Sequence, residues 1–408
     1  MPGCQKGEDQ PGVISGGSMA PALLGRHYRV ACHECQFEFT CDGINIPADR
    51  QTVCPNCGFA KNELKPAQFV AADRVSILST KEPQRWDIVA VSLGKQSEGS
   101  RQNIVKRVVA LPGERMEFDE GDILIDGEVV SKPLEIQRKM RIPVFDSDYR
   151  TPEDPELSRR LLRLTSPPGS GAGSPSSAPS ESLSAVVDST EKVRFQPITG
   201  YRSKEAGEPA PAIKDFYAYN QDLSRKLYVM DELFVQYDLL AEPEVALKIQ
   251  VPGRCASAVT LNIESVDLVQ YFKGQTRHQS FQMPPRQGIG LKIEISNFDG
   301  RLYLVVNDCE IFDVEALTGE RDEGEGSNSQ LELEIFGGPC RLNRLQVWRD
   351  IYFFDGGRYH FSQADLPRAG DAEYFLLGDN VPVSTDSRHW SEPGVNRKQI
   401  LGVVSQAP

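Results

Sequence analysis

Alternation of apolar and polar residues dominates the second half of the chain. Between residues 213 and 350, apolar side chains recur at every second position in short runs, and these runs are separated by residues typical of turns. The runs include Leu291, Ile293 and Ile295, then Leu302, Leu304 and Val306 after the turn NFDG, then Leu331, Leu333 and Ile335, and then Leu345 and Val347. A period of two is the side-chain period of a strand with one buried face. Short strands between turns predict an antiparallel β-sandwich.

Three other segments have distinct patterns. DILIDGEVV, residues 122–130, places two apolar runs around Asp-Gly and predicts a β-hairpin. Helical periodicity is confined to PELSRRLLR, residues 155–163. Residues 165–184, TSPPGSGAGSPSSAPSESLS, have too little apolar content to offset the entropy of ordering and predict a flexible linker. A smaller acidic loop is expected at 321–330.

The composition limits the classes of function. A chain of 408 residues is too long for one compact core and favours two or three domains. Its net charge of −13 argues against broad nucleic-acid binding and against simple attraction to anionic lipid. No run of 18 apolar residues predicts a membrane-spanning helix, and MPGCQKGEDQPG at the start lacks the apolar core of a signal peptide.

Four of the nine cysteines form two Cys-x-x-Cys pairs, CHEC at 32–35 and CPNC at 54–57. Two such pairs supply the four thiolates of a tetrahedral zinc ribbon, so we expect a structural zinc on Cys32, Cys35, Cys54 and Cys57. Two disulfides or a redox site are the alternatives, and His33 and Cys41 are less regularly placed substitutes. Four protein ligands leave no open position, so this metal is not expected to be catalytic.

Ser18 stands in the glycine-rich stretch GGSMAPALLG, residues 16–25, where a loop serine or a nucleophile would both fit. A nucleophile needs a proton acceptor, and none of the five histidines lies in a recognisable catalytic motif. Lys106 lies in the apolar run NIVKRVVALPGE, residues 103–114. Burial there would favour the neutral amine; the alternative is a strand lysine whose ammonium reaches water.

Four blocks resemble bacterial signal peptidase I, a membrane-bound Ser/Lys endopeptidase, and occur in that family's order. They are GSMAPAL at 17–23, RWDIVAV at 85–91, VKRVVALPGE at 105–114 and YFLLGDNVPVSTDSRHW at 374–390, with ILG at 400–402 completing the tail. The resemblance covers about a third of the chain.

The resemblance implies Ser18 as nucleophile and Lys106 as general base, with no cofactor for catalysis. Ser384 matches a serine that orients the lysine, and Asp386 and Arg388 match an ion pair that holds their loop. Gly16 stands where some members carry a hydroxyl, so the oxyanion hole would use backbone donors alone. The remaining supporting positions in these blocks are Gly17, Met19, Pro21, Arg107, Asp379 and Asn380.

The resemblance also implies partners and a location. The expected substrates are precursor proteins bearing signal peptides, cleaved after small residues. Family members have a spanning helix before the serine block, whereas 17 mostly polar and glycine-rich residues precede Ser18 here. Peripheral binding to a membrane surface, soluble substrates or an incomplete start would each account for this, and peripheral membrane association is the expectation.

The expected fold class is mainly β: a signal-peptidase-like catalytic domain in discontinuous segments, a zinc ribbon and an inserted sandwich of concanavalin-like or laminin-G-like type. The expected boundaries are 1–30 and 67–150 for the first two catalytic segments, 31–66 for the ribbon, 151–212 for the linker, 213–350 for the sandwich and 351–408 for the return and closing catalytic segment.

Two other functions compete with the endopeptidase. The first is a non-catalytic module on a relic peptidase frame, whose sandwich would bind a glycan or a protein. The second is a self-cleaving repressor, which also uses Ser and Lys; the acidic charge and the lack of a DNA-binding helix pair disfavour it. No nucleic-acid partner is expected.

Overall fold

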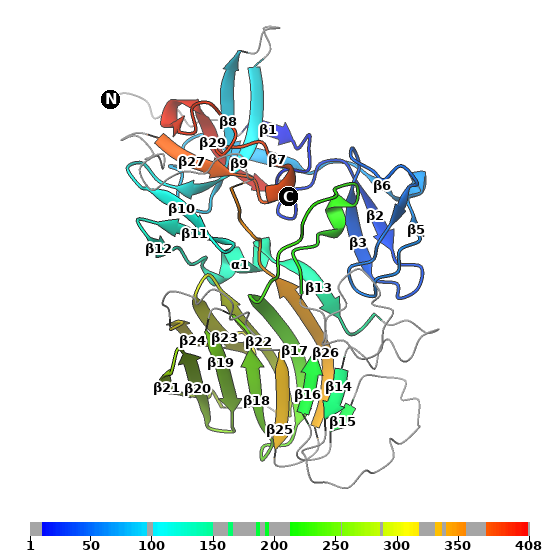
Figure 1. Cartoon of the computed structure of the whole chain (residues 1–408), viewed down its shortest axis with the longest axis vertical. Helices are drawn as coiled ribbons and strands as arrows, with labels where there is room; N and C mark the ends of the chain where they lie inside the picture. Colours follow the sequence, from blue (N-terminus) through cyan, green and yellow to red (C-terminus); the bar gives the residue numbers. More distant parts are fainter. Residues whose placement is uncertain are drawn as a thin grey trace, which may run out of the picture.

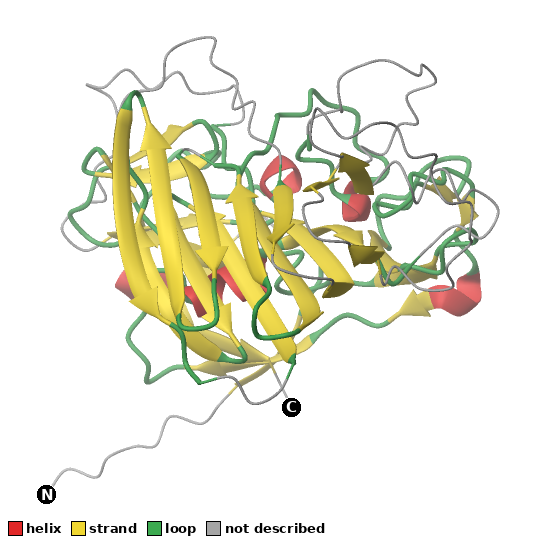
Figure 2. Ribbon diagram, turned by 90° about the horizontal axis from the view of Figure 1, so that it is seen from below, coloured by secondary structure: helices red, strands yellow, loops and turns green. Residues whose placement is uncertain are grey.

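Strands are the main secondary structure of the residues that the structure describes, and the helices there are short (Figure 2). The computed structural model describes residues 10–95, 101–149, 162–165, 185–187, 192–195, 213–253, 255–285, 289–317, 331–336, 340–355 and 373–406. The mainly β fold class is therefore confirmed. Within these ranges, no helix is long and apolar enough to cross a bilayer.

One antiparallel sheet unites the two ends of the chain in the upper part of Figure 1. Its order is β1-β7-β29-β8-β9-β27-β28. Apolar residues of β8, β9, β27 and β29 pack into one cluster, and a second cluster joins Ile14, Met19 and Leu23 to Val75 of β7. The strands are β1 (Gln10–Val13), β7 (Arg74–Leu78), β8 (Ile88–Lys95), β9 (Arg101–Ala110), β27 (Glu373–Leu377), β28 (Val395–Asn396) and β29 (Ile400–Gln406).

A small three-stranded sheet follows β9. It consists of β10 (Met116–Asp119), β11 (Asp122–Ile125) and β12 (Glu128–Val129), and α1 (Leu134–Met140) comes next. Asp126 and Gly127 both have positive φ, 52° and 87°, as a two-residue hairpin turn requires. The predicted hairpin at 122–130 is therefore confirmed.

The cysteine pairs lie in a separate small unit on the right of Figure 1. Three strands pair in the order β3-β2-β6, and β4 pairs with β5. These strands are β2 (His27–Ala31), β3 (Glu38–Asp42), β4 (Gln51–Thr52), β5 (Asn62–Glu63) and β6 (Phe69–Val70), and the 3-10 turn η1 (Pro66–Gln68) precedes β6.

Two antiparallel sheets form the predicted sandwich in the lower part of Figure 1. One has the order β13-β26-β17-β22-β23-β24, with β15 also on β26, and the other has the order β14-β16-β25-β18-β19-β20-β21. The alternating residues Leu291, Ile293, Leu302 and Leu304 all enter its core.

The strands of the sandwich fall between residues 142 and 349. They are β13 (Ile142–Asp146), β14 (Leu162–Thr165), β15 (Ala185–Val187), β16 (Lys192–Phe195), β17 (Leu233–Ala241), β18 (Ala246–Val251), β19 (Ala256–Leu261), β20 (Ser265–Phe272), β21 (Gln275–Gln282), β22 (Gly290–Phe298), β23 (Arg301–Val306), β24 (Cys309–Glu315), β25 (Glu332–Phe336) and β26 (Cys340–Arg349).

Four of these strands, β13 to β16, lie before residue 213, where the sequence predicts that the sandwich begins. The helix expected at 155–163 is wrong for residues 162 and 163, which belong to β14, because pairing of β14 with β16 overrides the local helical pattern. Residues 155–161 lie outside the described ranges, as do all of the linker 165–184 except Thr165 and all of the acidic loop 321–330.

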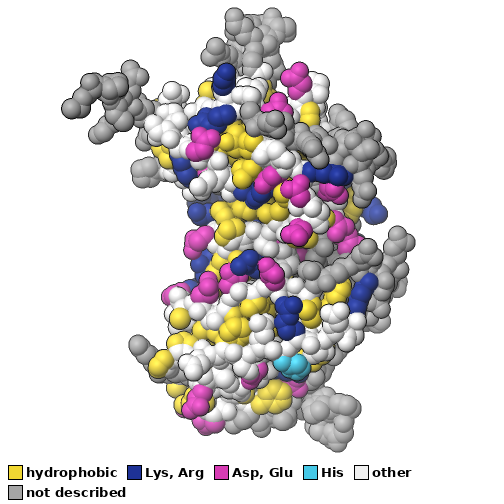
Figure 3. Space-filling view, turned by 90° about the vertical axis from the view of Figure 1, so that its left-hand side faces the viewer, with side chains coloured by type: hydrophobic (Ala, Val, Ile, Leu, Met, Phe, Trp, Pro, Cys, Tyr) yellow, Lys and Arg dark blue, Asp and Glu magenta, His cyan; other side chains and the backbone are white. Residues whose placement is uncertain are grey.

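Charged side chains of both signs are interspersed over the face in Figure 3. The net charge of −13 is therefore not gathered into a single-sign patch on this face.

Candidate active site and metal centre

The loop after β1 carries Ser18 toward the middle of the upper sheet. Ile14, Met19 and Leu23 are buried on either side of Ser18 and fix the loop by packing against Val75. The loop turns tightly, since Ala20 N donates to Gly17 O and Leu23 N donates to Met19 O. Ser18 itself is only half-buried, so its hydroxyl remains within reach of a ligand.

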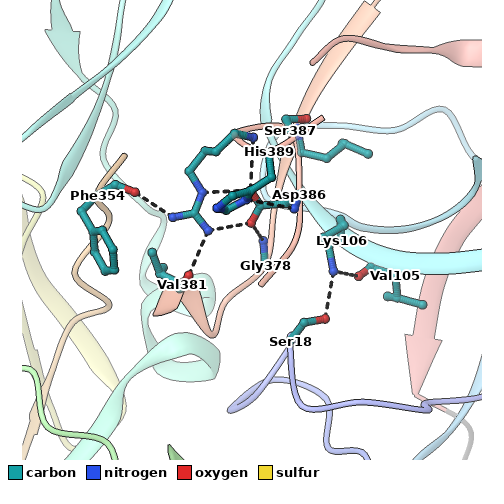
Figure 4. A network of polar contacts seen from close by, with 11 residues as sticks. Ser18, Val105, Lys106, Phe354, Gly378, Val381, Asp386, Ser387 and His389 are labelled. Carbon is teal, nitrogen blue, oxygen red and sulfur yellow. Dashed lines mark hydrogen bonds and ion pairs between the residues drawn. The ribbon is translucent and has the colours of Figure 1, made fainter. Parts of the chain in front are cut away.

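Lys106 extends from β9 to this hydroxyl (Figure 4). Its Nζ lies 2.9 Å from Ser18 Oγ and donates a second hydrogen bond to Val105 O at 3.2 Å. The residue is 3% exposed, so the amine does not extend into solvent. Burial lowers the pKa of Lys106 to about 8, although the negative charges of Asp386 and Asp379 oppose this shift.

The closing block holds the serine loop by its backbone. Asn380 N donates to Ser18 O at 3.0 Å, and Asn380 Nδ2 donates to Gly17 O at 3.0 Å. A Cβ on Gly378 would lie 2.5 Å from Ser18 O and 2.2 Å from Ser384 Oγ. The close approach of the two segments therefore requires glycine at 378.

Ser384 lies beside this contact, in the residue that ends the 3-10 turn η3 (Val381–Val383). Its Oγ is buried and, among the described residues, makes no hydrogen bond of ordinary geometry. Lys106 Nζ donates instead to Ser18 and Val105. The orienting role of Ser384 thus stays a prediction.

Two buried ion pairs lie close enough to Lys106 to affect its charge. Arg388 binds both carboxylate oxygens of Asp386 at 2.8 Å, and Gly378 N donates to the same carboxylate (Figure 4). Burial by itself would raise the pKa of Asp386, but Arg388 and these hydrogen bonds hold it below its usual range. Arg107 forms a similar fork on Asp379, at 2.6 and 2.5 Å.

The strand edge next to Lys106 is open. β9 pairs with β8 from Arg101 to Arg107, whereas on its other side β27 pairs only with Arg107, Val108 and Ala110. Within the described part of the chain, no strand covers the edge of residues 101–106 on that side. An extended peptide could add there by main-chain hydrogen bonds.

Sequence reasoning missed Tyr219 and Asn220, which lie in the 3-10 turn η2 (Ala218–Asn220). The ring of Tyr219 covers Gly17, and the side chain of Asn220 pairs with that of Asn380. No local pattern marks the segment FYAYNQ, because only its long-range contacts distinguish it.

The four predicted zinc ligands converge in the small unit. Their sulfurs all lie within 4.8 Å of one another, with Cys32 and Cys57 at 3.6 Å and Cys35 and Cys54 at 3.7 Å. All four residues are buried. Neither of the two predicted substitutes, His33 and Cys41, belongs to this group.

Each cysteine pair sits in a tight turn of the same design. In the first turn, Cys32 N donates to Phe37 O and Gln36 N donates to Cys32 O. In the second, Cys54 N donates to Phe59 O and Gly58 N donates to Cys54 O. Gln36 and Gly58 take positive φ at equivalent positions, 64° and 74°. The two matched turns bring four cysteine sulfurs together, a ligand set that is compatible with zinc.

The chain was also compared with solved structures and with protein families. The carbohydrate-binding module CBM66 from Bacillus subtilis is 8% identical, with a TM-score of 0.24, and the match covers 40% of this chain and 83% of that one. Galectin LEC-6 from Caenorhabditis elegans is 15% identical, with a TM-score of 0.23 and coverages of 29% and 83%. Sheep galectin-11, in complex with glycerol, is 13% identical, with a TM-score of 0.22 and coverages of 29% and 91%. These TM-scores are too low to support a function.

The sequence comparisons are more specific. No curated protein matches the chain. Residues 10–159 match the family described as signal peptidase, peptidase S26, and this range contains both Ser18 and Lys106. The match shows that this part of the chain is similar to the signal peptidase family.

Proposed function

We propose that the chain is a Ser/Lys endopeptidase that removes leader peptides from precursor proteins by cleaving after small residues. The observation that carries the proposal is the 2.9 Å contact between Lys106 Nζ and Ser18 Oγ. A lysine with a pKa of about 8 has an appreciable neutral fraction near neutral pH, unlike an ordinary lysine. The match of residues 10–159 to signal peptidases supports the same reaction class.

The reaction is acyl transfer to Ser18. The neutral amine of Lys106 takes the hydroxyl proton as Ser18 Oγ bonds to the scissile carbonyl carbon. Backbone N–H groups of the serine loop stabilise the oxyanion. As the carbonyl reforms, the C–N bond breaks and Lys106 returns the proton to the leaving amine. Water, deprotonated by Lys106, then hydrolyses the acyl-enzyme and restores the Ser18 hydroxyl.

The open edge of β9 is the proposed place for the substrate backbone. A leader peptide added along residues 101–106 would run past Lys106, where the strand meets the serine loop. Main-chain hydrogen bonds supply affinity in this mode, and shallow pockets for alternate side chains supply the selection of small residues.

The four clustered thiolates are proposed to hold one structural zinc ion. The site is closed by protein ligands alone, so the metal would organise the small unit and take no part in the chemistry.

Peripheral contact with a membrane surface is part of the proposal. Val13, at the end of β1, is 68% exposed, and Val383, next to Ser384, is 40% exposed. Both belong to segments that flank the dyad, and exposed apolar side chains of this kind can enter the headgroup region of a bilayer.

The proposal is tested by incubating the full chain with a panel of leader-bearing precursors, with and without detergent. Cleavage after a small residue is expected, and S18A or Lys106→Met should abolish it, at least about a thousandfold. Ser405→Ala and Lys398→Met, which alter exposed residues, are the matched controls. Full activity in either dyad variant, or no cleavage of any precursor by the unaltered chain, contradicts the proposal.

A further inference from the structure

The segment Phe216–Gln221, here called the strap, joins three parts of the molecule. At its start, Arg349 of β26 donates to the carbonyls of Asp215 and Phe216 at 2.9 and 2.8 Å, which anchors it to the sandwich. From there it runs between the serine loop and the small unit that contains Cys32, Cys35, Cys54 and Cys57, here called the cysteine unit. Figure 1 shows this green segment rising from the sandwich toward the small blue unit.

The strap contacts the nucleophile loop at Tyr219 and Asn220. A Cβ on Gly17 would lie 2.5 Å from Cε1 of Tyr219, so the ring packs directly on the residue before Ser18. The two amides of Asn220 and Asn380 exchange hydrogen bonds of 2.6 and 2.8 Å. Asn380 is the residue that binds the carbonyls of Gly17 and Ser18, so the strap supports the loop from two sides.

Packing alone holds the Tyr219 ring. The residue is 1% exposed, and its hydroxyl has no hydrogen-bond partner among the described residues. Burial raises the pKa of the Tyr219 hydroxyl, which therefore stays neutral. Because no polar contact fixes the ring, its position depends on the backbone of the strap.

The strap ends on the cysteine unit. The side-chain amide of Gln221 accepts from Val53 N at 3.1 Å and donates to Val53 O at 3.0 Å. Val53 precedes the ligand residue Cys54 directly. Ala218 lies within the apolar core of the cysteine unit, and Phe216 packs against that core.

The second cysteine turn is also fixed from its other side. Asn56, between Cys54 and Cys57, accepts from Asp146 N at 2.7 Å and donates to Tyr149 O at 3.0 Å. We expect the shape of this turn to depend on a bound metal, because metal binding supplies much of the folding free energy of such small units. A change in the turn would then reach Gln221 through its two hydrogen bonds with Val53.

We propose that the strap positions Ser18 for attack, and that Gln221 couples the cysteine unit to the nucleophile loop, so that metal occupancy of the cysteine site sets the rate of acylation. Tyr219, Asn220 and Gln221 act as positioning residues. This inference rests on the proposed endopeptidase function. Misplacing a nucleophile by about 1 Å can cost on the order of a hundredfold in rate.

The experiment compares Gln221→Met with Gln275→Met in the full chain, each with zinc bound and after removal of metal by a chelator. Gln221→Met removes both hydrogen bonds to Val53 at similar volume, and Gln275 is an exposed glutamine of β21. The readouts are kcat, KM, the pH profile, zinc content and hydrogen exchange of residues 14–25.

With zinc bound, Gln221→Met is expected to lower kcat about 10- to 100-fold with KM and the pH midpoint unchanged, since Lys106 is not touched. Chelation should lower the kcat of the unaltered chain by a similar factor. It should lower the kcat of Gln221→Met little further. Adding zinc back should restore the kcat of the unaltered chain. Additive losses, or losses confined to KM, overturn the coupling.

Hydrogen exchange separates this inference from the proposed function. Faster exchange at residues 14–25 in Gln221→Met and in the metal-free chain supports the coupling even if no precursor is cleaved. Unchanged exchange in both overturns it, even if the unaltered chain is an active peptidase.

Discussion

At the scale of single residues, the pKa of Lys106 is determined mainly by the burial of its side chain. Lys106 sits in an apolar strand, and desolvation lowers its pKa to about 8 against the pull of Asp386 and Asp379. These two carboxylates are themselves neutralised by Arg388 and Arg107 through buried two-pronged ion pairs. Pairing of the carboxylates with arginine weakens their effect on the lysine, so that desolvation wins.

This balance predicts the pH dependence of the reaction. The reactive form has a neutral Lys106, which is present above its pKa and is lost as the pH falls. We expect kcat/KM to rise about tenfold per pH unit below about pH 8 and to level off above it. Steady-state kinetics with a peptide substrate, repeated at a series of pH values, measures this rise in kcat/KM. A rate that does not change between about pH 6 and 9 would remove Lys106 from the role of base.

At the scale of elements, local signals predicted much of what the structure contains. The Asp-Gly turn of β11 and β12 and the alternating runs of β22 and β23 follow from side-chain periods that a short window reveals. The spacing of the cysteine pairs likewise predicted that the four sulfurs lie close together. β14 shows the limit of such signals, because its pairing with β16 decides its structure.

The cysteine unit gives a prediction at this scale. Cys54→Ser removes one of four buried ligands, so bound zinc should fall from about one per chain toward zero. Amides of the unit should then exchange faster, because the metal supplies its folding free energy. Elemental analysis of reduced protein and hydrogen exchange provide the measurements. Cys309→Ser, at an exposed cysteine, should keep its zinc; retention of full zinc by Cys54→Ser would contradict the site.

At the scale of the whole molecule, a buried charge cluster joins the sandwich to the small three-stranded sheet. Lys132, which follows β12 and is fully buried, forms ion pairs with Asp299 of the sandwich and with Asp350 just after β26. Its ammonium also lies 5.3 Å from the centre of the Trp86 ring. One cation thus links the small three-stranded sheet to both the turn between β22 and β23 and the end of β26.

Removing this cation should weaken the whole molecule. Lys132→Met leaves two carboxylates buried without their cation, a change that typically costs about 3–5 kcal/mol. Denaturant unfolding followed by tryptophan fluorescence would report the loss. Lys248→Met, on a sandwich strand away from this cluster, is the matched control. A midpoint equal to that of the control would show that the junction does not depend on Lys132.

The sequence by itself determined the mainly β fold class and the cysteine pairs, because periodicity and motif spacing are local properties of the chain. The resemblance of its blocks to a known family singled out Ser18 and Lys106 as candidates. Only the tertiary structure decided that Ser384 faces Gly378 without binding Lys106, and that Tyr219 and Asn220 support the serine loop. Asn380 and Gly17 are 363 positions apart, and Asn220 and Asn380 are 160 apart. Contacts at such separations depend on how the sheets and the cysteine unit pack together, which no short stretch of residues encodes.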